Sequence, residues 1–73
     1  MNLIVDKKLK TPVYLQIVSQ IKRKIISGDL ASGYALPSER NLADKLGIHR
    51  NTVVRAYTEL KADGLITSYQ GQI

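Results

Sequence analysis

Hydrophobic residues between Val13 and Ile26 recur every three or four positions, which is the spacing of one side of an α-helix. Thr11 and Pro12 suit the start of this helix, with threonine as the cap and proline in the first helical position, and Gly28 suits its end. The stripe contains Val13, Tyr14, Ile17, Val18, Ile21, Ile25 and Ile26, and we expect it to form core. The polar residues Gln16, Ser19, Gln20, Lys22, Arg23 and Lys24 are expected to face solvent.

A second helix is indicated between Pro37 and Gly47. Ser38 can cap its first turn, and Gly47 easily takes the left-handed backbone conformation that ends many helices. The periodic pattern resumes at about His49 and closes at Gly64. The apolar faces hold Leu42, Ala43 and Leu46 in the earlier helix and Val53, Ala56, Tyr57 and Leu60 in the later one. Two short helices around a glycine turn are typical of a helix-turn-helix, whose second helix enters the major groove of DNA.

After Gly64 the short β-branched and aromatic run from Leu65 to Tyr69 predicts a strand, Gln70-Gly71 a turn and Gln72-Ile73 the start of a returning strand. The segment from Asp29 to Ala35 is expected to be a loop. The fold class is therefore mainly α with a small β wing: three helices plus a two-stranded hairpin whose second strand is truncated. Because a hairpin cut in this way is only marginally stable, it indicates a piece of a longer protein.

The chain has 73 residues, no cysteine and one histidine, which fits one small domain and excludes a disulfide framework or a Cys/His zinc site. No apolar run approaches the roughly 20 residues that a membrane span needs, and the opening apolar patch is too short for a secretory signal. We therefore expect a soluble, cytoplasmic chain with its natural start and no cofactor.

Eleven Lys and Arg residues against six Asp and Glu leave a net charge of +5, which fits a protein that binds a polyanion. Part of this charge lies in residues 1–10, where Lys7, Lys8 and Lys10 form a cluster. This basic N-terminal segment could be a flexible arm that lies along DNA phosphates, or a frayed end with solvated charges. For the cluster Lys22-Arg23-Lys24, a solvated face is favoured over a phosphate contact.

Many of these positions stand in the order and spacing of the GntR-family DNA-binding domain, which the chain resembles over residues 11 to 71. The matching positions are Pro12-Val-Tyr-Leu-Gln-Ile17, Gly28-Asp-Leu30, Gly33, Leu36-Pro-Ser-Glu-Arg40, Leu42-Ala43, Leu46-Gly47, Arg50, Thr52-Val53, Leu60 and Gly64-Leu-Ile66. The resemblance implies a winged helix-turn-helix domain, here residues 11–73, from a bacterial transcription regulator. Such a domain normally precedes a larger one that binds an effector and dimerises, so we expect a homodimer on a palindromic operator. The 73-residue chain alone is expected to be a monomer or a weak dimer.

The segment from Arg50 to Tyr57 resembles two subgroups of this family, and the choice between them stays open. MocR-type regulators carry an aminotransferase-like domain that needs pyridoxal phosphate, whereas YtrA-type regulators carry a short helical dimerisation tail. Three departures from the family pattern change the expected site. Because His49 replaces the usual Ser or Thr cap, this cap is expected to be weaker or to pass to another residue. Val54 stands where many members have an arginine, which puts that DNA contact in doubt, and Ile73 stands where the wing usually has its second glycine.

The candidate DNA-binding residues are Ser38, Arg40, His49, Arg50, Asn51, Thr52, Arg55, Tyr69, Gln70 and Gly71. Arg50 and Asn51 begin the recognition helix, where arginine can pair with guanine and asparagine with adenine. Ser38 and Thr52 can donate to phosphates, and the resemblance makes Arg40 a further DNA contact, either to a phosphate or to a base. Arg55 shares the face opposite the core with Asn51 and Thr58 and can reach base or backbone, while residues 69–71 of the wing could enter the minor groove.

Two other classes of function were weighed against DNA binding. An enzyme has little support, because the six carboxylates are scattered and the single His49 lies in no nucleophile pattern. A winged helix that binds protein would be expected to replace the recognition-helix arginines with acidic or apolar residues. The chain keeps Arg50 and Arg55, although Val54 leaves a small opening for that alternative. We therefore predict a non-enzymatic, sequence-specific reader of double-stranded operator DNA.

Overall fold

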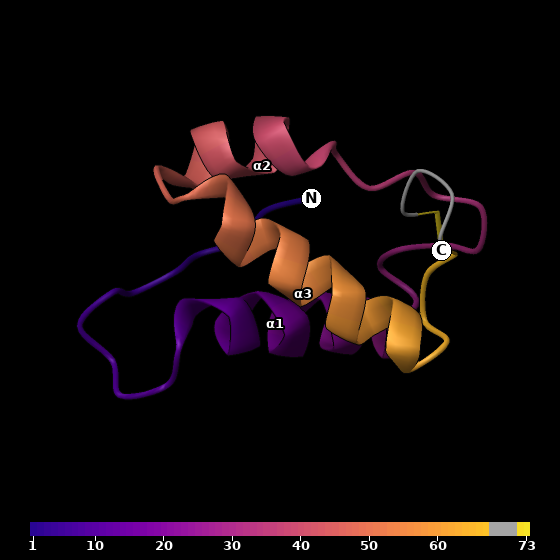
Figure 1. Ribbon diagram of the computed structural model, residues 1–73. Coiled ribbons are helices and arrows are strands. Elements are labelled where there is room, and N and C mark those ends of the chain that lie inside the picture. Colours follow the sequence, from indigo (N-terminus) through magenta and orange to yellow (C-terminus); the bar gives the residue numbers. More distant parts are fainter. Residues whose placement is uncertain (68–71) are drawn as a thin grey trace.

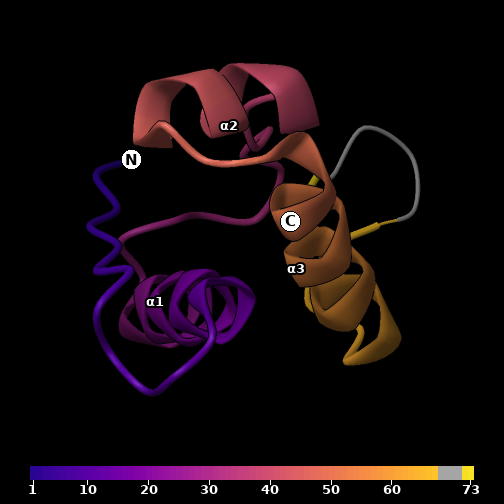
Figure 2. The same cartoon turned by 60° about the vertical axis from the view of Figure 1, so that its left-hand side comes forward.

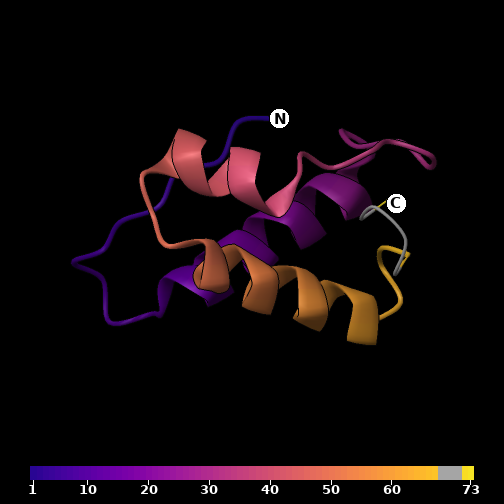
Figure 3. The ribbon, with the colours of Figure 1, turned by 45° about the horizontal axis from the view of Figure 1, so that its top comes forward.

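Three helices make up the regular structure of the computed structural model, which describes residues 1–67 and 72–73. They are α1 (Val13–Ser27), α2 (Glu39–Leu46) and α3 (Arg50–Ala62). Helix α3 packs against both of the others, crossing α1 at an angle and passing beneath α2 (Figures 1 and 3). The expectation of a mainly α domain of three helices is thus confirmed.

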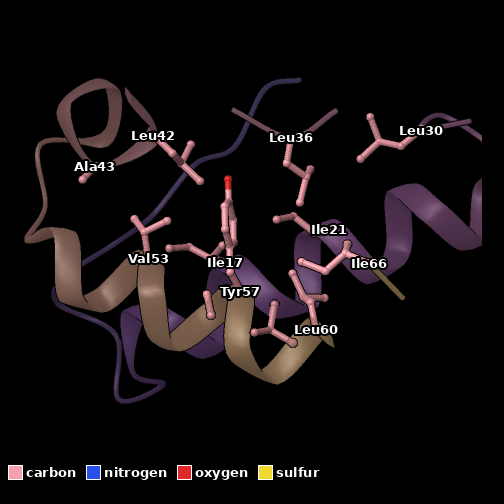
Figure 4. Close-up of a cluster of buried hydrophobic side chains, with 12 residues drawn as sticks. Ile17, Ile21, Leu30, Leu36, Leu42, Ala43, Val53, Tyr57, Leu60 and Ile66 are labelled. Atoms are coloured by element: carbon pink, nitrogen blue, oxygen red, sulfur yellow. The ribbon is translucent and has the colours of Figure 1, made fainter. Parts of the chain in front are cut away.

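The core lies between the helices and receives side chains from all three (Figure 4). Its buried members are Ile17, Val18, Ile21, Leu30, Leu36, Leu42, Ala43, Val53, Ala56, Tyr57, Leu60 and Ile66. Burying a side chain such as Ile17 or Leu60, both fully inaccessible, contributes about 1.5–3 kcal/mol. Most of the predicted apolar stripe is confirmed, but Ile26 is 81% exposed. It lies near the end of α1, on the edge of the stripe and beyond the reach of the core.

Helix α1 begins one residue later than the sequence predicted. Pro12 is the N-cap residue instead of the first helical residue, and no side-chain hydrogen bond caps this end, so Thr11 does not have the capping role expected of it. The end of α1 is as predicted: Gly28 has φ 88°, and its N–H donates to the carbonyl of Ile25 at 3.2 Å. The left-handed backbone at Gly28 is one that other residues adopt only with strain.

The first six residues are held against α1 through two glutamine side chains that the sequence predicted to face solvent. The N–H of Asp6 donates to Gln16 Oε1 at 2.8 Å, and Gln16 Nε2 donates back to the Asp6 carbonyl at 2.9 Å. Gln20 makes the same pair with Ile4, at 3.0 and 2.6 Å. Gln16 is only 9% exposed, so its prediction as a solvent-facing residue is wrong.

This docking concerns the first part of the N-terminal segment only, because Lys8 and Lys10 of the basic cluster are exposed, and a DNA contact by residues 1–10 stays a prediction. Met1, Leu3 and Val5 pack against the core, while the alternate residue Ile4 points outward. Figure 2 shows this segment on one side of α1 and α3 on the other. Helical periodicity could not predict the docking, because the partners of Gln16 and Gln20 lie outside the helix.

The two C-terminal residues return to the loop that precedes α2. Ala35 and Gln72 form an isolated antiparallel bridge. The Ile73 N–H donates to the Tyr34 carbonyl at 3.0 Å, and the Thr67 N–H donates to the Gln72 carbonyl at 2.6 Å. No strand occurs in residues 1–67 and 72–73, so the wing hairpin remains a prediction, and its residues 68–71 lie outside the described part. The pairing of Ala35 differs from the simple loop that the sequence predicts for residues 29–35.

Candidate nucleic-acid interface

Both ends of α2 are capped by the residues that the sequence predicted. Ser38 caps α2 by accepting a hydrogen bond from the Asn41 N–H at 3.1 Å. At the other end of α2, Gly47 has φ 66°, and the Ile48 N–H donates to the Ala43 carbonyl at 3.0 Å. These contacts set the direction in which the chain leaves α2 and enters α3.

His49 occupies the N-cap position of α3 and fills the role that serine or threonine would have. Its Nδ1 accepts a hydrogen bond from the Asn51 N–H at 3.2 Å. An imidazole nitrogen can accept only when it carries no proton, so the cap requires the neutral ring with its proton on Nε2. The cap of α3, which was expected to be weaker or to pass to another residue, is therefore supplied by the histidine itself.

The first turns of α2 and α3 are brought together by polar contacts. Arg50 Nη2 lies 3.4 Å from Glu39 Oε1, and the Arg50 side chain remains 62% exposed. The Tyr57 hydroxyl donates to the Pro37 carbonyl at 2.7 Å, which fastens the entry of α2 to the middle of α3. In Figure 4 the Tyr57 hydroxyl points from the core toward the segment that carries Leu36. The Arg50–Glu39 contact and the Tyr57–Pro37 hydrogen bond together fix the position of the start of α2 relative to α3.

Burial also changes the acidity of this tyrosine. Burial raises the pKa of the Tyr57 phenol above its usual value, and the nearby Glu39 carboxylate and Tyr34 add to the increase. The phenol therefore keeps its proton, and its hydrogen bond to Pro37, throughout the neutral pH range.

The predicted site residues divide into three groups. Ser38, Arg40, His49, Arg50, Asn51 and Thr52 gather at the adjoining ends of α2 and α3, where all but the half-buried Thr52 are exposed. Arg55 is exposed too, but its guanidinium carbon lies 3.9 Å from the centre of the Tyr14 ring on α1. Tyr69, Gln70 and Gly71 lie outside the described residues.

Lys22 and Lys7, which are not among the candidate DNA-binding residues, form contacts within the domain. Lys22 forms an ion pair with Asp63 at 2.7 Å, joining α1 to the end of α3. Lys7 donates to the Gly47 carbonyl at 2.9 Å, which ties the N-terminal segment to the turn before α3. The described residues contain no group of three or more acidic, histidine or cysteine side chains that could hold a metal ion.

A comparison with protein families identifies a family for this chain with its capped helices and exposed basic residues. Residues 13–72 match the model described as bacterial regulatory proteins of the gntR family. The chain belongs to the GntR family. It is therefore the DNA-binding domain of a helix-turn-helix transcriptional regulator, and this domain is not an enzyme.

Individual relatives agree with the family assignment. The GntR-family domain is 46% identical over 68 residues to the HTH-type transcriptional regulator YdfD and 38% identical over 68 residues to the HTH-type transcriptional repressor YtrA, both of Bacillus subtilis. These matches cover 92% and 93% of the chain. Among solved structures, YtrA from Sulfolobus acidocaldarius, a GntR-family transcription factor, matches with a TM-score of 0.88 and 40% identity. That match covers 96% of this chain and 74% of the YtrA chain.

The GntR-family domain accounts for only part of its relatives. It spans 14% of the length of YdfD and 52% of that of YtrA. Across residues 1–67 and 72–73, no helix combines the length and the apolar character needed to cross a membrane.

Sequence reasoning missed two residues of the GntR-family site. Glu39 was treated only as part of a motif, yet it is the partner of Arg50. Tyr14 was assigned to the core, yet its half-buried ring also lies under Arg55. An acidic residue in the first turn of α2 is a common helix-stabilising feature, so nothing in the pattern distinguished Glu39 from an ordinary helix start.

Proposed function

We propose that the domain binds double-stranded operator DNA with sequence specificity. In this proposal α3 and its cap, about residues 49–62, lie in the major groove with the first turn toward the base edges, and the wing, about residues 65–73, lies at the minor groove. The observation that carries the proposal is the position of Arg50, which is exposed at the start of α3 with its guanidinium beside Glu39. A side chain at this end of a recognition helix reaches the bases in other helix-turn-helix proteins.

The neighbouring side chains suit different parts of the duplex. Arg50 can donate two hydrogen bonds to guanine, and Asn51 can pair with adenine in the same groove. Arg40 and Thr52, with the Ser38 hydroxyl in addition to its capping role, are proposed to bind backbone phosphates. The wing residues Tyr69, Gln70 and Gly71 are proposed to contact the minor groove. The hydrogen bonds that draw Gln72 and Ile73 back to residues 33–35 and 67 support a returning wing strand.

The natural regulator is proposed to act as a cytoplasmic homodimer on a palindromic operator. The length of the relatives supports this, because YtrA and YdfD both extend well beyond a domain of this size. The similarity to YtrA favours a YtrA-type regulator, and the alternative is a MocR-type chain with a pyridoxal-phosphate-binding domain. A test for pyridoxal phosphate in the natural full-length protein separates the two.

The experiment that tests DNA binding is selection from a random pool of duplex DNA at two salt concentrations, followed by sequencing. We expect enrichment of a short motif and an affinity that falls steeply as salt rises, because phosphate contacts release counterions. Salt-sensitive binding without an enriched motif would contradict sequence specificity. No binding even at low salt would contradict the proposal as a whole and favour a domain that binds protein.

A further inference from the structure

Arg55 is the second arginine of α3, and its surroundings differ from those of Arg50. Its guanidinium carbon lies 3.9 Å from the centre of the Tyr14 ring, so the charged group stacks on an aromatic face of α1. We propose that Tyr14 positions Arg55 to bind a backbone phosphate of the operator, and that Arg55 reads no base. This inference rests on the DNA binding proposed above.

The geometry of a helix separates the two arginines. Five positions along an α-helix correspond to a rotation of about 500°, or about 140° beyond one full turn, and to an advance of about 7.5 Å. When Arg50 points at the floor of the groove, Arg55 therefore points away from the floor, toward the rim of the groove where the backbone phosphates lie. A helix with its side chains is about 10–12 Å across and nearly fills a major groove about 12 Å wide, so a long side chain directed at the rim lies close to a phosphate backbone.

Tyr14 is suited to hold the side chain in that direction. The ring is half-buried and packs against the hydrophobic core, so the core restricts its position. A cation within about 6 Å of a ring centre is attracted by the negative face of the ring. Stacking uses the flat face of the guanidinium and leaves the N–H groups around its edge available for phosphate oxygens.

The charge of Arg55 is also available for an anion. Within residues 1–67 and 72–73, no carboxylate forms an ion pair with Arg55, whereas Arg50 pairs with Glu39 and Lys22 with Asp63. An exposed arginine that is held by a ring and not neutralised by an acid can bind a phosphate without first breaking an ion pair. Arg50 must instead exchange Glu39 for a base, which suits a residue that discriminates between partners.

The test uses Arg55→Ala, Tyr14→Leu, Tyr14→Phe and the double variant Arg55→Ala/Tyr14→Leu. Arg23→Ala serves as the matched control, because Arg23 is an exposed arginine of α1 that lines a groove with Ile4 of the N-terminal segment. Each protein is titrated with the selected operator and with random duplex DNA at several salt concentrations. The melting temperature of each variant is measured in parallel.

We expect Arg55→Ala to weaken binding to both DNAs by the same factor, about tenfold, as for one lost charge-assisted hydrogen bond. The slope of log K against log salt should become shallower by about 0.9, the value of one phosphate contact. Tyr14→Phe should leave affinity and slope unchanged, because the ring is kept. Tyr14→Leu should weaken binding, and the double variant should bind no worse than Arg55→Ala alone, since Tyr14 acts through Arg55.

Several results would overturn the inference. If Arg55→Ala changed the preference at one base pair and left the salt slope intact, Arg55 would be a base-reading residue. Additive losses in the double variant would show that Tyr14 acts independently, as would a loss in Tyr14→Leu that follows only its melting temperature. An equal change of slope in Arg23→Ala would mean that the slope reports general charge. Failure of the unaltered domain to bind DNA would reject the proposed function itself, a result distinct from all of these.

Discussion

Glu39 and Arg50 come from different helices, and their 3.4 Å contact joins the two helix ends at which the candidate DNA-binding side chains gather. Because Arg50 is well exposed, solvent screens the pair and its effect on folding stability is small. Its importance is geometric. The carboxylate gives a long, flexible side chain a defined position in the free domain, so the base contact proposed for Arg50 requires ordering fewer rotamers.

At this residue, Arg50→Ala is expected to cost about 1–3 kcal/mol of binding free energy on the selected operator and to relax the preference at one base pair. The reason is the loss of two directed hydrogen bonds to a base. The measurement is equilibrium binding to the operator and to versions with single base-pair changes, with Arg23→Ala as the control for removing a charge. Equal weakening on operator and random DNA would show that Arg50 reads no base.

The raised pKa of Tyr57 predicts that the free energy of unfolding changes with pH in the alkaline range. Burial raises the pKa of its phenol in the folded state, whereas the unfolded phenol ionises near pH 10. Below that pH both states hold the proton. Above it the unfolded chain loses the proton first, so the stabilisation from the neutral phenol diminishes as pH rises.

The matching variant is Tyr57→Phe, which lacks both the ionisation and the hydrogen bond to the Pro37 carbonyl. It should be less stable by about 1 kcal/mol at pH 7. This deficit should shrink between about pH 10 and 11, where only the wild-type protein loses the contribution of Tyr57. Urea unfolding of both proteins across this range is the measurement. A constant difference between the two curves would contradict the assignment.

Among single residues, those with local roles were predictable and those with distant partners were not. The Ser38 cap follows from a hydroxyl three positions before its donor. The partner of Arg50 lies 11 positions away, and that of the Tyr57 hydroxyl lies 20 positions away. A one-dimensional pattern carries no measure of such separations, so it indicated which face the side chains share but not what they touch.

At the level of the helices, the cap of α3 depends on His49 and can be tested directly. His49→Ala should lower the free energy of unfolding by about 0.5–2 kcal/mol, because it leaves the Asn51 N–H without its acceptor. His49→Ser should retain most of the stability, since serine is a strong cap at this position. Urea unfolding of the three proteins is the measurement. Equal losses in both variants would mean that the imidazole contributes through packing instead of capping.

The helices themselves were predictable because periodicity, caps and glycine ends are local features of the sequence. The error at the start of α1 has the same origin, since Thr11 and Pro12 are plausible residues for that position and only the backbone shows which one caps. The bridge between Ala35 and Gln72 could not be predicted, because it pairs residues from opposite ends of the helix-turn-helix. The β-branched residues predict a two-stranded wing, and they give no sign that Ala35, from the loop before α2, pairs with Gln72.

At the level of the whole molecule, the size of the domain limits how it can bind. Its longest dimension is 32 Å, and half-sites of a palindromic operator lie about 34 Å apart when they are one helical turn apart. One domain can therefore occupy one half-site only. A second copy is needed to contact both half-sites of the palindromic operator proposed for this domain.

We accordingly expect the chain to sediment as a monomer and to bind the operator weakly. Joining two copies through a flexible linker that can span the half-sites should raise operator affinity by about 100-fold or more, because the second binding event becomes intramolecular. The control carries the same linker and an Arg50→Ala substitution in one copy. A stable dimer at micromolar concentration, or no gain from linking the copies, would contradict this account.

Gln16 and Gln20 of α1 hold the N-terminal segment through side-chain hydrogen bonds, so this segment can detach without unfolding of the helices. The N–H groups of Ile4 and Asp6 are bonded to side-chain amides instead of to a helix or a sheet. Detaching the first six residues would expose them to deuterium while the three helices remain folded. Their exchange rates thus report a local opening with a smaller free energy than global unfolding. In a protein without tryptophan, these two amides offer a label-free readout of how firmly the N-terminal segment is held.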